Sequence, residues 1–442
     1  MTTKQQRNYR RMLSLGFIIP PDYLNFQPFK NQQLTALYLL TILENTFGNK
    51  LDLSIIDLRG ISKDNISYYL PKKDVYCYTA FSPQFRIISE IKDHLRSMYP
   101  EAVHIISGPH IDLFSEQVAG FDTLALGEGE ENIVCIVNDI FNGTLKHIYR
   151  NIKPIDINKF PFPLRKYQPV SAVVDTGFFY EDRLLRASNV LFSRGCPFRC
   201  RFCANLNSGP TRYRLPRLVE EEIAYLKKEY SVQALVLRDD NSIPVNKKVA
   251  KPFLQALMNG NVKWRGQARA NGITEEMVAL AAESGCLDLA LGIESACPEV
   301  LDIVNKKIDL EETKRFIKIL KKYKIGVKLL LVLGLPGEPQ DIVSRMIAFI
   351  NEADPDIVGL ALFCPFPGST IAANYKNFGI KEINPNLHEY HILYGRFDEK
   401  EKPKLMFEYN ETTPWGKGMK PETIINNYNK LQDFVRKNHL IS

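Results

Sequence analysis

Short apolar runs alternate with amphipathic segments along most of this chain, and that alternation limits the folds open to it. In residues 1–150 the apolar runs have strand length, and segments with apolar residues at helical spacing lie between or beside them. We expect strands at Asp52–Asp57, Asp74–Thr79, Val103–Ser107 and Asp122–Leu126. We expect helices at Gln32–Thr46, Phe85–Met98 and Glu130–Phe141. Strands that are apolar throughout are buried on both faces, so the pattern predicts a Rossmann-like parallel sheet between helices.

The alternation resumes from about residue 186. The expected strands are Asn189–Ser193, Ala234–Arg238, Lys263–Gln267, Asp288–Gly292, Val327–Leu333 and Asp356–Phe363. The expected helices are Leu218–Tyr230, Lys247–Met258, Thr274–Ser284, Leu310–Lys322 and Asp341–Ala353. This succession of βα units predicts an α/β fold that is either a doubly wound sheet or a partial (β/α) barrel. In both folds the loops after the strands bind ligands.

The two blocks are joined by a proline-punctuated segment, in which Lys159-Phe160-Pro161-Phe162-Pro163 favours an extended path. The expected parts are a sheet domain at 1–150, a linker at 151–185, a barrel-like domain at 186–380 and a C-terminal extension at 381–442. The extension contains the aromatic and polar stretches Phe407–Asn410 and Trp415–Lys417 and a closing helix near Pro421–Lys437. These stretches suit either a lid over a substrate or a tail that packs on helices.

Composition and charge limit the classes of partner that this chain is expected to bind. The chain has 57 Lys+Arg against 50 Asp+Glu, and its 45% apolar content is normal for a globular protein. This mild, dispersed positive charge does not indicate a nucleic-acid partner. No apolar run approaches the roughly 20 residues of a membrane-spanning helix, and we expect no membrane partner. The apolar patch Leu13–Ile19 lacks the cleavage site of a signal peptide, which predicts a cytoplasmic location.

Three of the eight cysteines lie close together, as Cys196, Cys200 and Cys203, directly after the first expected strand of the second block. A closed zinc site takes four ligands, and the nearest histidines in the sequence are His147 and His388. Three thiolates on one loop suit three corners of a 4Fe–4S cluster, whose fourth iron is then open to another ligand. Three buried cysteines, or a zinc site with a distant fourth ligand, are the alternatives.

This CxxxCxxC pattern, with Phe202 before its last cysteine, resembles the signature of the radical S-adenosylmethionine (SAM) superfamily. The resemblance implies a partial (β/α)₆ barrel and one 4Fe–4S cluster held by Cys196, Cys200 and Cys203. It also implies that SAM binds the open iron through its amino and carboxylate groups. An electron from a donor such as flavodoxin or ferredoxin then cleaves SAM to a 5′-deoxyadenosyl radical. The resemblance assigns no catalytic side chain.

Two pairs of residues after later strands extend the resemblance. Asp239 and Asp240 follow the second expected strand, where the superfamily places a group that bonds the methionyl amine, although the common Gly-Gly-Glu form is absent. Glu294 and Ser295 follow the fourth strand and are similar to the family's contacts to the ribose and carboxylate of SAM. A carboxylate suits ribose because it accepts two hydrogen bonds.

After the fifth expected strand, Gly334, Pro336 and Gly337 belong to a Gly-Leu-Pro-Gly-Glu segment that resembles the family's approach to adenine. Glycine permits such a close backbone approach. Each motif alone is common in turns and helix entries, but their order after one cysteine cluster predicts radical chemistry. An auxiliary cluster is not expected, because the first half contains only Cys77 and Cys135.

The first block is similar to the domain of the radical SAM subgroup that binds cobalamin. The turns Ser107-Gly108-Pro109-His110 and Gly127-Glu128-Gly129-Glu130 carry this similarity, together with the sheet pattern and the proline-rich bridge. Gly127 and Gly129 would let backbone N–H groups face a phosphate or nucleotide tail, and His110 would lie near that tail. The alternatives are an ordinary tight turn and a histidine that is a satisfied surface group. Many cobalamin proteins supply an axial histidine from DxHxxG, but here the place reads Asp57-Leu58-Arg59-Gly60.

The resemblance therefore implies an enzyme that uses one 4Fe–4S cluster, SAM and cobalamin. Its most common activity is methyl transfer to an unactivated carbon of a small or medium-sized metabolite. One alternative is rearrangement, ring contraction or cyclisation without methyl transfer. Another is a binding protein that senses cobalamin and carries an inert barrel. The sequence does not name the substrate.

Overall fold

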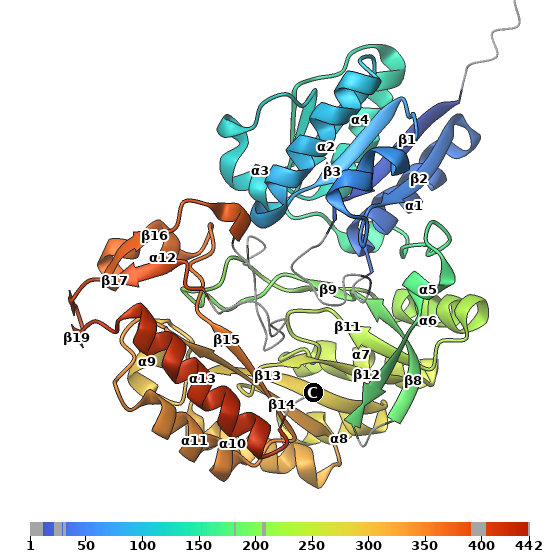
Figure 1. The fold of residues 1–442 in the computed structure, drawn as a ribbon. Helices are drawn as coiled ribbons and strands as arrows, with labels where there is room; N and C mark the ends of the chain where they lie inside the picture. Colours follow the sequence, from blue (N-terminus) through green and yellow to red (C-terminus); the bar gives the residue numbers. More distant parts are fainter. Residues whose placement is uncertain are drawn as a thin grey trace, which may run out of the picture. The chain divides into compact units, whose positions relative to one another are not determined.

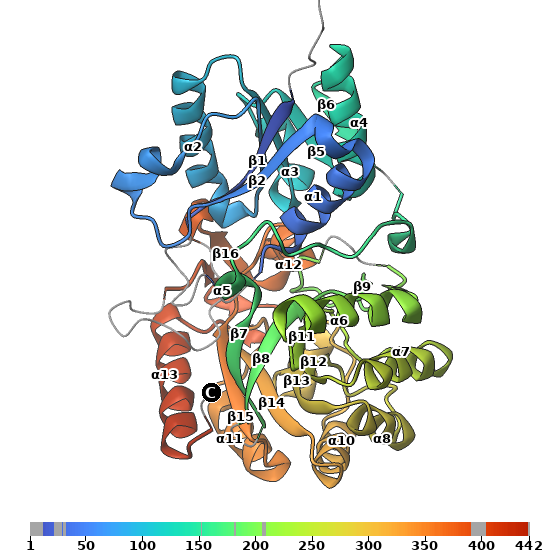
Figure 2. The ribbon, with the colours of Figure 1, turned by 90° about the vertical axis from the view of Figure 1, so that its right-hand side faces the viewer.

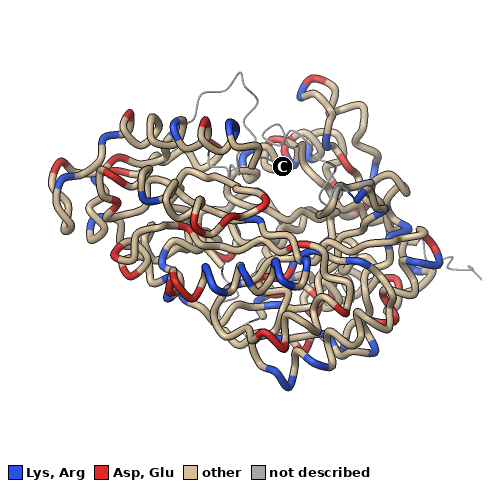
Figure 3. Tube along the Cα trace, turned by 90° about the horizontal axis from the view of Figure 1, so that it is seen from below, with Lys and Arg blue, Asp and Glu red and all other residues tan. Residues whose placement is uncertain are grey.

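The structure is a computed structural model that describes residues 12–21, 29, 32–151, 153–180, 183–205, 209–389 and 404–440. The chain forms two compact units, Met1–Pro169 and Val170–Ser442 (Figure 1). Figure 3 shows Lys and Arg interspersed with Asp and Glu along the trace, as the dispersed charge of the sequence predicts. No described helix has the length and apolar content needed to cross a membrane.

A parallel six-stranded sheet forms the centre of the first unit, in the order β2-β1-β3-β4-β5-β6. Its strands are β1 (Leu13–Ile19), β2 (Leu51–Asp57), β3 (Val75–Thr79), β4 (Val103–Ser107), β5 (Thr123–Leu126) and β6 (Ile148–Arg150). The expected Rossmann-like parallel sheet is confirmed. The winding direction reverses between β1 and β3, and sheets of this kind bind ligands beyond the carboxyl ends of the strands at such a point.

Helices cover both faces of this sheet. They are α1 (Leu34–Phe47), α2 (Phe85–Met98), α3 (Pro109–Phe114) and α4 (Gly129–Asn142). Leu15 and Phe17 of β1 belong to the apolar core under α1 and α4, whereas Ile18 belongs to the core under α2. Side chains alternate between faces along a strand, so one apolar strand serves both cores. The sequence pattern did not identify β1 or β6 as strands. β6 is only three residues long, and the seven residues of β1 were considered only as an apolar patch near the N-terminus.

The second unit contains a curled seven-stranded sheet in the order β15-β14-β13-β12-β11-β8-β7. Its strands are β7 (Asp175–Phe179), β8 (Arg183–Val190), β11 (Ala234–Leu237), β12 (Lys263–Ala268), β13 (Cys286–Glu294), β14 (Gly326–Leu333) and β15 (Ile357–Leu362). The strands from β8 to β15 run parallel, and β7 is an antiparallel edge strand. Of the two folds that the sequence allowed, this is the partial barrel.

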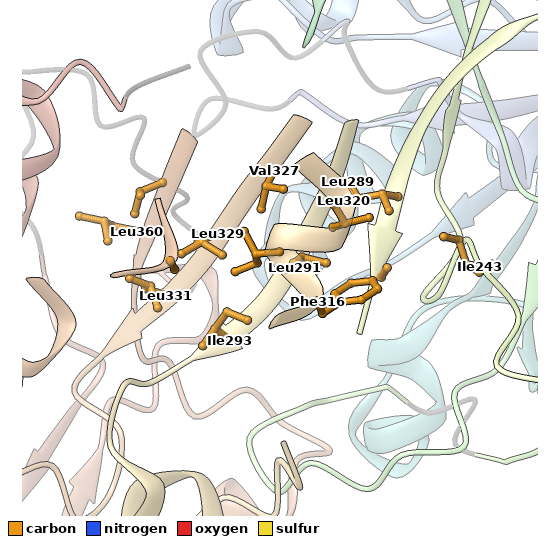
Figure 4. Packing of buried hydrophobic residues seen from close by; sticks show 14 of the residues in the cluster. Ile243, Leu289, Leu291, Ile293, Phe316, Leu320, Val327, Leu329, Leu331 and Leu360 are labelled. Atoms are coloured by element: carbon orange, nitrogen blue, oxygen red, sulfur yellow. The ribbon is translucent and has the colours of Figure 1, made fainter. Parts of the chain in front are cut away.

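Helices line the outer side of the curled sheet (Figure 1). They are α6 (Pro216–Tyr230), α7 (Lys247–Gly260), α8 (Glu275–Glu283), α10 (Leu310–Lys322) and α11 (Ile342–Ala353). Leu289, Leu291 and Ile293 of β13 lie near Phe316 and Leu320 of α10 in the buried core (Figure 4). The alternate residues of β13, which include Gly292 and Glu294, share the opposite face of the sheet. That face is the inner side of the barrel.

The first barrel strand differs from the prediction. It was expected at Asn189–Ser193, but β8 ends at Val190, and the short strand β9 (Ser193–Arg194) pairs instead with β10 (Arg212–Tyr213). β7 and the start of β8 lie within the segment expected to be a linker. The start of β8 was not recognised as a strand because it contains charged residues, which are common where a hairpin at the edge of a sheet meets solvent.

The C-terminal part packs on the barrel. Strands β16 (Ile380–Ile383) and β17 (Phe407–Tyr409) pair, as do β18 (Thr412–Thr413) and β19 (Gly416–Lys417). Helix α13 (Pro421–Lys437), which begins and ends where predicted, lies beside β15 and α11 (Figure 2). The short helices α5 (Val170–Val173), α9 (Pro298–Ile303) and α12 (Thr370–Ala373) complete the unit. Residues 390–403 and 441–442 of the expected extension lie outside the described residues.

Candidate active site

The cysteine loop begins where the first parallel strand of the barrel ends. Cys196, Cys200 and Cys203 follow β9, and none of the three is fully buried. Gly195 precedes them with a φ of 97°, a conformation that glycine adopts without strain. The carboxyl ends of parallel barrel strands all lie at one mouth, so this placement directs the three thiols toward the mouth of the barrel.

Hydrogen bonds from distant segments fix the middle of the loop. The Arg201 N–H donates to the Val304 carbonyl at 2.9 Å, and its guanidinium donates to the Ile303 carbonyl at 2.8 Å. The side-chain amide of Asn305 donates to the Arg199 carbonyl at 2.7 Å. The loop is therefore held by the segment that follows α9, and its conformation does not depend on the thiols alone.

Each thiol has a polar donor nearby. The backbone amides of Phe198 and Asn205 bond Cys196 and Cys203, which partly opposes the rise in pKa that burial causes at both thiols. Nη1 of Arg269 lies 3.5 Å from Sγ of Cys200. Such N–H donors stabilise thiolate ligands of iron–sulfur clusters, so the donor set fits a 4Fe–4S cluster.

The described residues include no group of three His, Cys, Asp or Glu side chains arranged around a single metal ion. This finding is compatible with a four-iron cluster, in which each thiolate binds a different iron. The thiols of Cys196, Cys200 and Cys203 nevertheless lie close enough to influence one another electrostatically.

Asp239 and Asp240 follow β11 but have different environments. Asp239 is 1% exposed, and its Oδ1 accepts hydrogen bonds from the Phe192 N–H at 3.1 Å and the Ser193 hydroxyl at 2.5 Å. Burial raises its pKa to about 7. The carboxylate thus ties the segment between β8 and the cysteine loop to the next strand.

Asp240 faces the cysteines instead. It is exposed, accepts a hydrogen bond from Nδ2 of Asn205 at 2.8 Å, and contributes to the raised pKa of the Cys196 and Cys203 thiols after the larger effect of burial. The neighbouring Asn241, which is buried, places its side-chain nitrogen 3.8 Å from Sγ of Cys196. The structure therefore brings Asp240, but not the carboxylate of Asp239, to the thiols.

Glu294 ends β13 on the inner side of the barrel. Its Oε1 lies 2.7 Å from Nζ of Lys306, and the same ammonium lies 5.9 Å from the centre of the Phe202 ring. The structure thus brings together two predicted site residues, Phe202 and Glu294, through a lysine that sequence reasoning missed. Ser295 is fully buried, and its hydroxyl accepts the Cys297 N–H at 3.3 Å.

The predicted adenine segment forms a tight loop after β14. Gly334 and Gly337 have φ values of 91° and 81°, and a side chain at Gly337 would meet Ile303 and Trp415. Pro336 is buried. The loop packs against Ile303, whose carbonyl accepts a hydrogen bond from the Arg201 guanidinium. The same residue therefore contacts both this loop and the cysteine loop.

Glu338 closes this segment, although sequence reasoning gave it no role. Its Oε2 accepts the Gly334 N–H at 2.8 Å, and burial of the carboxyl group raises its pKa to about 8. The other oxygen, Oε1, is buried without a hydrogen-bond partner among the described residues. Tyr409 donates to the Gly334 carbonyl at 2.9 Å, and a hollow beside the loop is lined in part by Trp415 and Lys417.

In the first unit, Ser107 is the last residue of β4, and Gly108 follows it. Gly108 has a φ of 105°, and a side chain there would collide with the backbone of Ala80. The Ala80 N–H donates to the Ser107 carbonyl at 2.8 Å, and the Ser107 hydroxyl makes only a long contact of 3.4 Å with the Tyr78 carbonyl. The Thr79 hydroxyl is buried without a hydrogen-bond partner in the described part of the chain. Short side chains thus surround the ends of β3 and β4.

The Gly127 turn is satisfied within the protein. Its N–H donates to Asp112 at 2.7 Å, and its φ of 81° permits close approach to the Asn151 carbonyl. Gly129 lets the start of α4 pack against Leu39 of α1. The expected orientation of the Gly127 N–H toward a phosphate is therefore corrected, because Asp112 accepts that hydrogen bond.

His110 is buried rather than near the surface. Its ring stacks on Phe85 with centres 4.1 Å apart, lies beside Phe114 and bonds the Ser82 hydroxyl at 3.1 Å. Burial lowers its pKa to about 4, so the ring is neutral at physiological pH. The alternative of a satisfied surface group is therefore corrected: the ring has partners, but it is buried among Phe85 and Phe114.

A buried arginine occupies the place where cobalamin proteins often carry an axial histidine. Arg59 is 3% exposed, and its guanidinium binds the carboxylate of Asp57 at 2.6 and 2.8 Å. The Leu58 N–H donates to the Ile19 carbonyl at 3.0 Å, which holds the end of β2 against β1.

Comparisons with known proteins agree with this geometry. Residues 190–350 match the Radical SAM superfamily. A protein of Pyrococcus horikoshii described as an uncharacterized methyltransferase is 26% identical over 60% of this chain and 61% of its own. The anaerobic magnesium-protoporphyrin IX monomethyl ester cyclase of Rubrivivax gelatinosus is 25% identical over 73% of this chain and 63% of its own. The bacteriochlorophyllide d C-12(1)-methyltransferase of Chlorobaculum tepidum is 23% identical over 92% of this chain and 84% of its own. This chain spans between 52% and 63% of the length of the first three curated relatives.

Two solved structures share the fold. The radical SAM methyltransferase TsrM from Kitasatospora setae, with cobalamin and a [4Fe–4S] cluster bound, has a TM-score of 0.64 at 16% identity, over 83% of this chain and 75% of its own. The cobalamin-dependent SAM radical enzyme OxsB has a TM-score of 0.62 at 13% identity, over 98% of this chain and 62% of its own. The part of the chain that matches the Radical SAM superfamily, residues 190–350, thus contains the three cysteines that follow β9.

Proposed function

We propose that this protein is a cobalamin-dependent radical SAM enzyme that methylates an unactivated carbon of a small or medium-sized metabolite. The observation that carries the proposal is the set of three thiols at the barrel mouth, with Asp240 and Arg269 beside them. The fold shared with TsrM and OxsB and the methyltransferase names of several relatives support it.

Cys196, Cys200 and Cys203 would hold the 4Fe–4S cluster. When bound, the cluster with SAM supplies hydrogen-atom abstraction, and cobalamin supplies a methyl group. The chain itself would bind the cluster and SAM and orient them. The Asp240 carboxylate would accept hydrogen bonds from the amino group of SAM, because it faces the thiols while the Asp239 carboxylate is bonded to the β8 segment.

The inner face of the barrel offers the remaining contacts to SAM. Glu294 presents a carboxylate there and is kept in place by Lys306. Gly334 and Gly337 would let the backbone approach the adenine ring, and Tyr409 holds that segment through the Gly334 carbonyl. We assign the ribose contact to Glu294, whose second oxygen, Oε2, is not the one that faces Lys306.

Cobalamin would lie beyond the carboxyl ends of the strands in the first unit. Gly108 lets the backbones of β3 and β4 approach closely there, and the Thr79 hydroxyl, which has no partner among the described residues, would offer a hydrogen bond. Arg59 and Asp57 are bonded to each other where an axial histidine is often found. We therefore propose that the lower face of cobalt receives no histidine from this segment.

A second candidate is cyclisation with the same cofactors and no methyl transfer. It is favoured by the similarity to relatives named as magnesium-protoporphyrin IX monomethyl ester cyclases, one of which covers 73% of this chain. The two candidates share the thiol site and differ in whether S-adenosylhomocysteine is formed.

The partners follow from the chemistry. The substrate would be a small molecule, and a low-potential electron donor such as flavodoxin or ferredoxin would reduce the cluster. The eight cysteines form no disulfide in the structure, and the thiol ligands must stay reduced to bind iron. We therefore propose a cytoplasmic location.

The test is product analysis with the anaerobically reconstituted full-length protein. Cobalamin, SAM and dithionite are supplied, and 5′-deoxyadenosine and S-adenosylhomocysteine are quantified. We expect both products from the wild type, neither above background from Cys200→Ala, and wild-type amounts from Cys135→Ala, which alters an exposed cysteine on α4. 5′-Deoxyadenosine without S-adenosylhomocysteine would favour cyclisation, and absence of both from the wild type would contradict the proposed function.

A further inference from the structure

Arg269 lies beside the cysteine loop, one residue after β12 ends. The residue is 6% exposed. Its guanidinium carbon is 3.9 Å from the centre of the Phe198 ring, and its Nη1 is 3.5 Å from Sγ of Cys200. Phe198 and Cys200 both belong to the CxxxCxxC loop, so one side chain contacts that loop by stacking and by hydrogen bonding.

The guanidinium is held in a fixed orientation, and no carboxylate among the described residues pairs with it. Its Nε lies 3.4 Å from Oδ1 of Asn271, and Asn271 is itself anchored by a 2.8 Å hydrogen bond to the Lys307 carbonyl. Nη2 is buried without a hydrogen-bond partner among the described residues. A buried donor without a partner is costly, so a polar or anionic group is expected next to it when the site is complete.

The charge of Arg269 acts on the thiols directly. Its Nη1 donates to Sγ of Cys200, one of the three thiols that would hold the cluster. Reduction of a thiolate-bound cluster adds one negative charge to a centre that is already anionic. A cation fixed at 3.5 Å from a ligand sulfur stabilises that added charge, and burial keeps salt from screening it.

We propose that Arg269 is a positioning residue that raises the reduction potential of the 4Fe–4S cluster through its contact with Cys200. The inference rests on the proposed function only in that the three thiols hold a cluster. Phe198 contributes by providing the ring on which the guanidinium lies, since a planar cation stacks on an aromatic face. Nη2 has no partner among the described residues, so a cluster sulfide or a bound anion would complete its hydrogen bonding.

The test is an EPR-monitored redox titration of the reconstituted full-length protein, without SAM or substrate. Arg269→Gln removes the charge, and Arg269→Lys keeps a charge but loses the planar fork. We expect Arg269→Gln to change the reduction equilibrium at least tenfold toward the oxidised cluster, which is about 59 mV for one electron. Arg269→Lys should fall between Arg269→Gln and the wild type.

Arg265, which lies on β12 four residues before Arg269, provides a matched control. Its guanidinium carbon also lies 3.9 Å from a phenylalanine ring, that of Phe179, and its charge is paired with Asp288 at 3.5 Å. Phe179 lies on β7, outside the cysteine loop. Arg265→Gln should leave the potential at the wild-type value. An equal shift in this variant would overturn the proposal, because it would show a general effect of removing an arginine.

Phe198→Leu is the second variant and carries the test if Arg269→Gln takes up no cluster. Without the ring beneath it, the guanidinium loses its fixed position, and we expect the potential to fall in the same direction. Wild-type potentials in Phe198→Leu and in any cluster-bearing Arg269→Gln would overturn the role of Arg269. Failure of the wild type to assemble a cluster would instead overturn the proposed function, so the two failures are distinguishable.

Discussion

Nζ of Lys306 lies 2.7 Å from Oε1 of Glu294, and the two side chains are only 9% and 12% exposed. Glu294 has a φ of 68°, a left-handed conformation that is unfavourable for a residue other than glycine. It follows an irregularity in the pairing of β13 with β14. The ion pair therefore holds a strained strand end on the inner side of the barrel, directly above Gly292.

Replacing the lysine should destabilise the protein. Lys306→Met leaves the Glu294 carboxylate nearly enclosed and without its cation, and we expect a loss of roughly 3 kcal/mol, the lower end of the range for breaking a buried ion pair. The measurement is urea unfolding of the apoprotein. Lys307→Met is the control, because the neighbouring side chain is exposed and should change stability by less than about 0.5 kcal/mol. Equal losses in both variants would show that the ion pair is not the cause.

Substitutions of the two adjacent aspartates should have different effects, one on folding stability and the other on SAM binding. Asp239→Ala removes the acceptor of two buried donors, the Phe192 N–H and the Ser193 hydroxyl, and should cost about 2–5 kcal/mol. Asp240→Ala should leave unfolding nearly unchanged but weaken SAM binding about tenfold, because a charge-assisted hydrogen bond is lost. Denaturant unfolding and equilibrium dialysis with the reconstituted protein measure the two effects. Normal SAM affinity in Asp240→Ala would remove this residue from the site.

Glu338 predicts a dependence of stability on pH. Its folded-state pKa of about 8 lies above the ordinary value of 4.5, so the folded protein binds the extra proton between these values. This contribution to stability is complete below about pH 4.5 and is lost as the pH rises through 8. Glu338→Gln stays neutral and should lose less stability than the wild type between pH 6 and 9. Each unit of pKa shift corresponds to about 1.4 kcal/mol of unfolding free energy. Parallel pH profiles for the two proteins would show that the carboxyl group is not buried as described.

The tyrosine that supports the adenine segment should affect cofactor binding more than folding. Tyr409→Phe removes the hydrogen bond to the Gly334 carbonyl while keeping the buried ring, so about 1–2 kcal/mol of stability should be lost. We expect weaker SAM binding, because the segment around Gly334 loses its anchor. Isothermal titration with SAM measures this change. Unaltered SAM affinity together with lower stability would restrict Tyr409 to a packing role.

Elements with strong periodicity could be predicted from the sequence. β4, α2 and α13 begin and end at the predicted residues, because their apolar spacing is regular over the whole element. β7 could not be predicted, since it exists through antiparallel pairing with β8 rather than through its own pattern. β8 was displaced for a related reason: charged residues at its start make the edge of the sheet look like a loop.

The kind of site could be predicted from the sequence, but the contacts between its side chains could not. The spacing of Cys196, Cys200 and Cys203 predicted a 4Fe–4S site at this loop. The sequence did not distinguish Asp239 from Asp240, because the difference comes from Phe192 and Ser193, far away along the chain. Arg269 and Lys306 were missed for the same reason, although the position of Arg269 just after an expected strand was a usable signal.

We propose that one protein binds both a 4Fe–4S cluster and cobalamin. The most direct measurement is the visible spectrum, with iron and cobalt contents, after anaerobic reconstitution with iron, sulfide and hydroxocobalamin and removal of the excess. We expect four iron atoms and one cobalt per chain, and an iron–sulfur band that disappears in Cys200→Ala while cobalamin is retained. An iron–sulfur band without retained cobalt would contradict the assignment of the first unit, and a protein with neither would contradict the account as a whole.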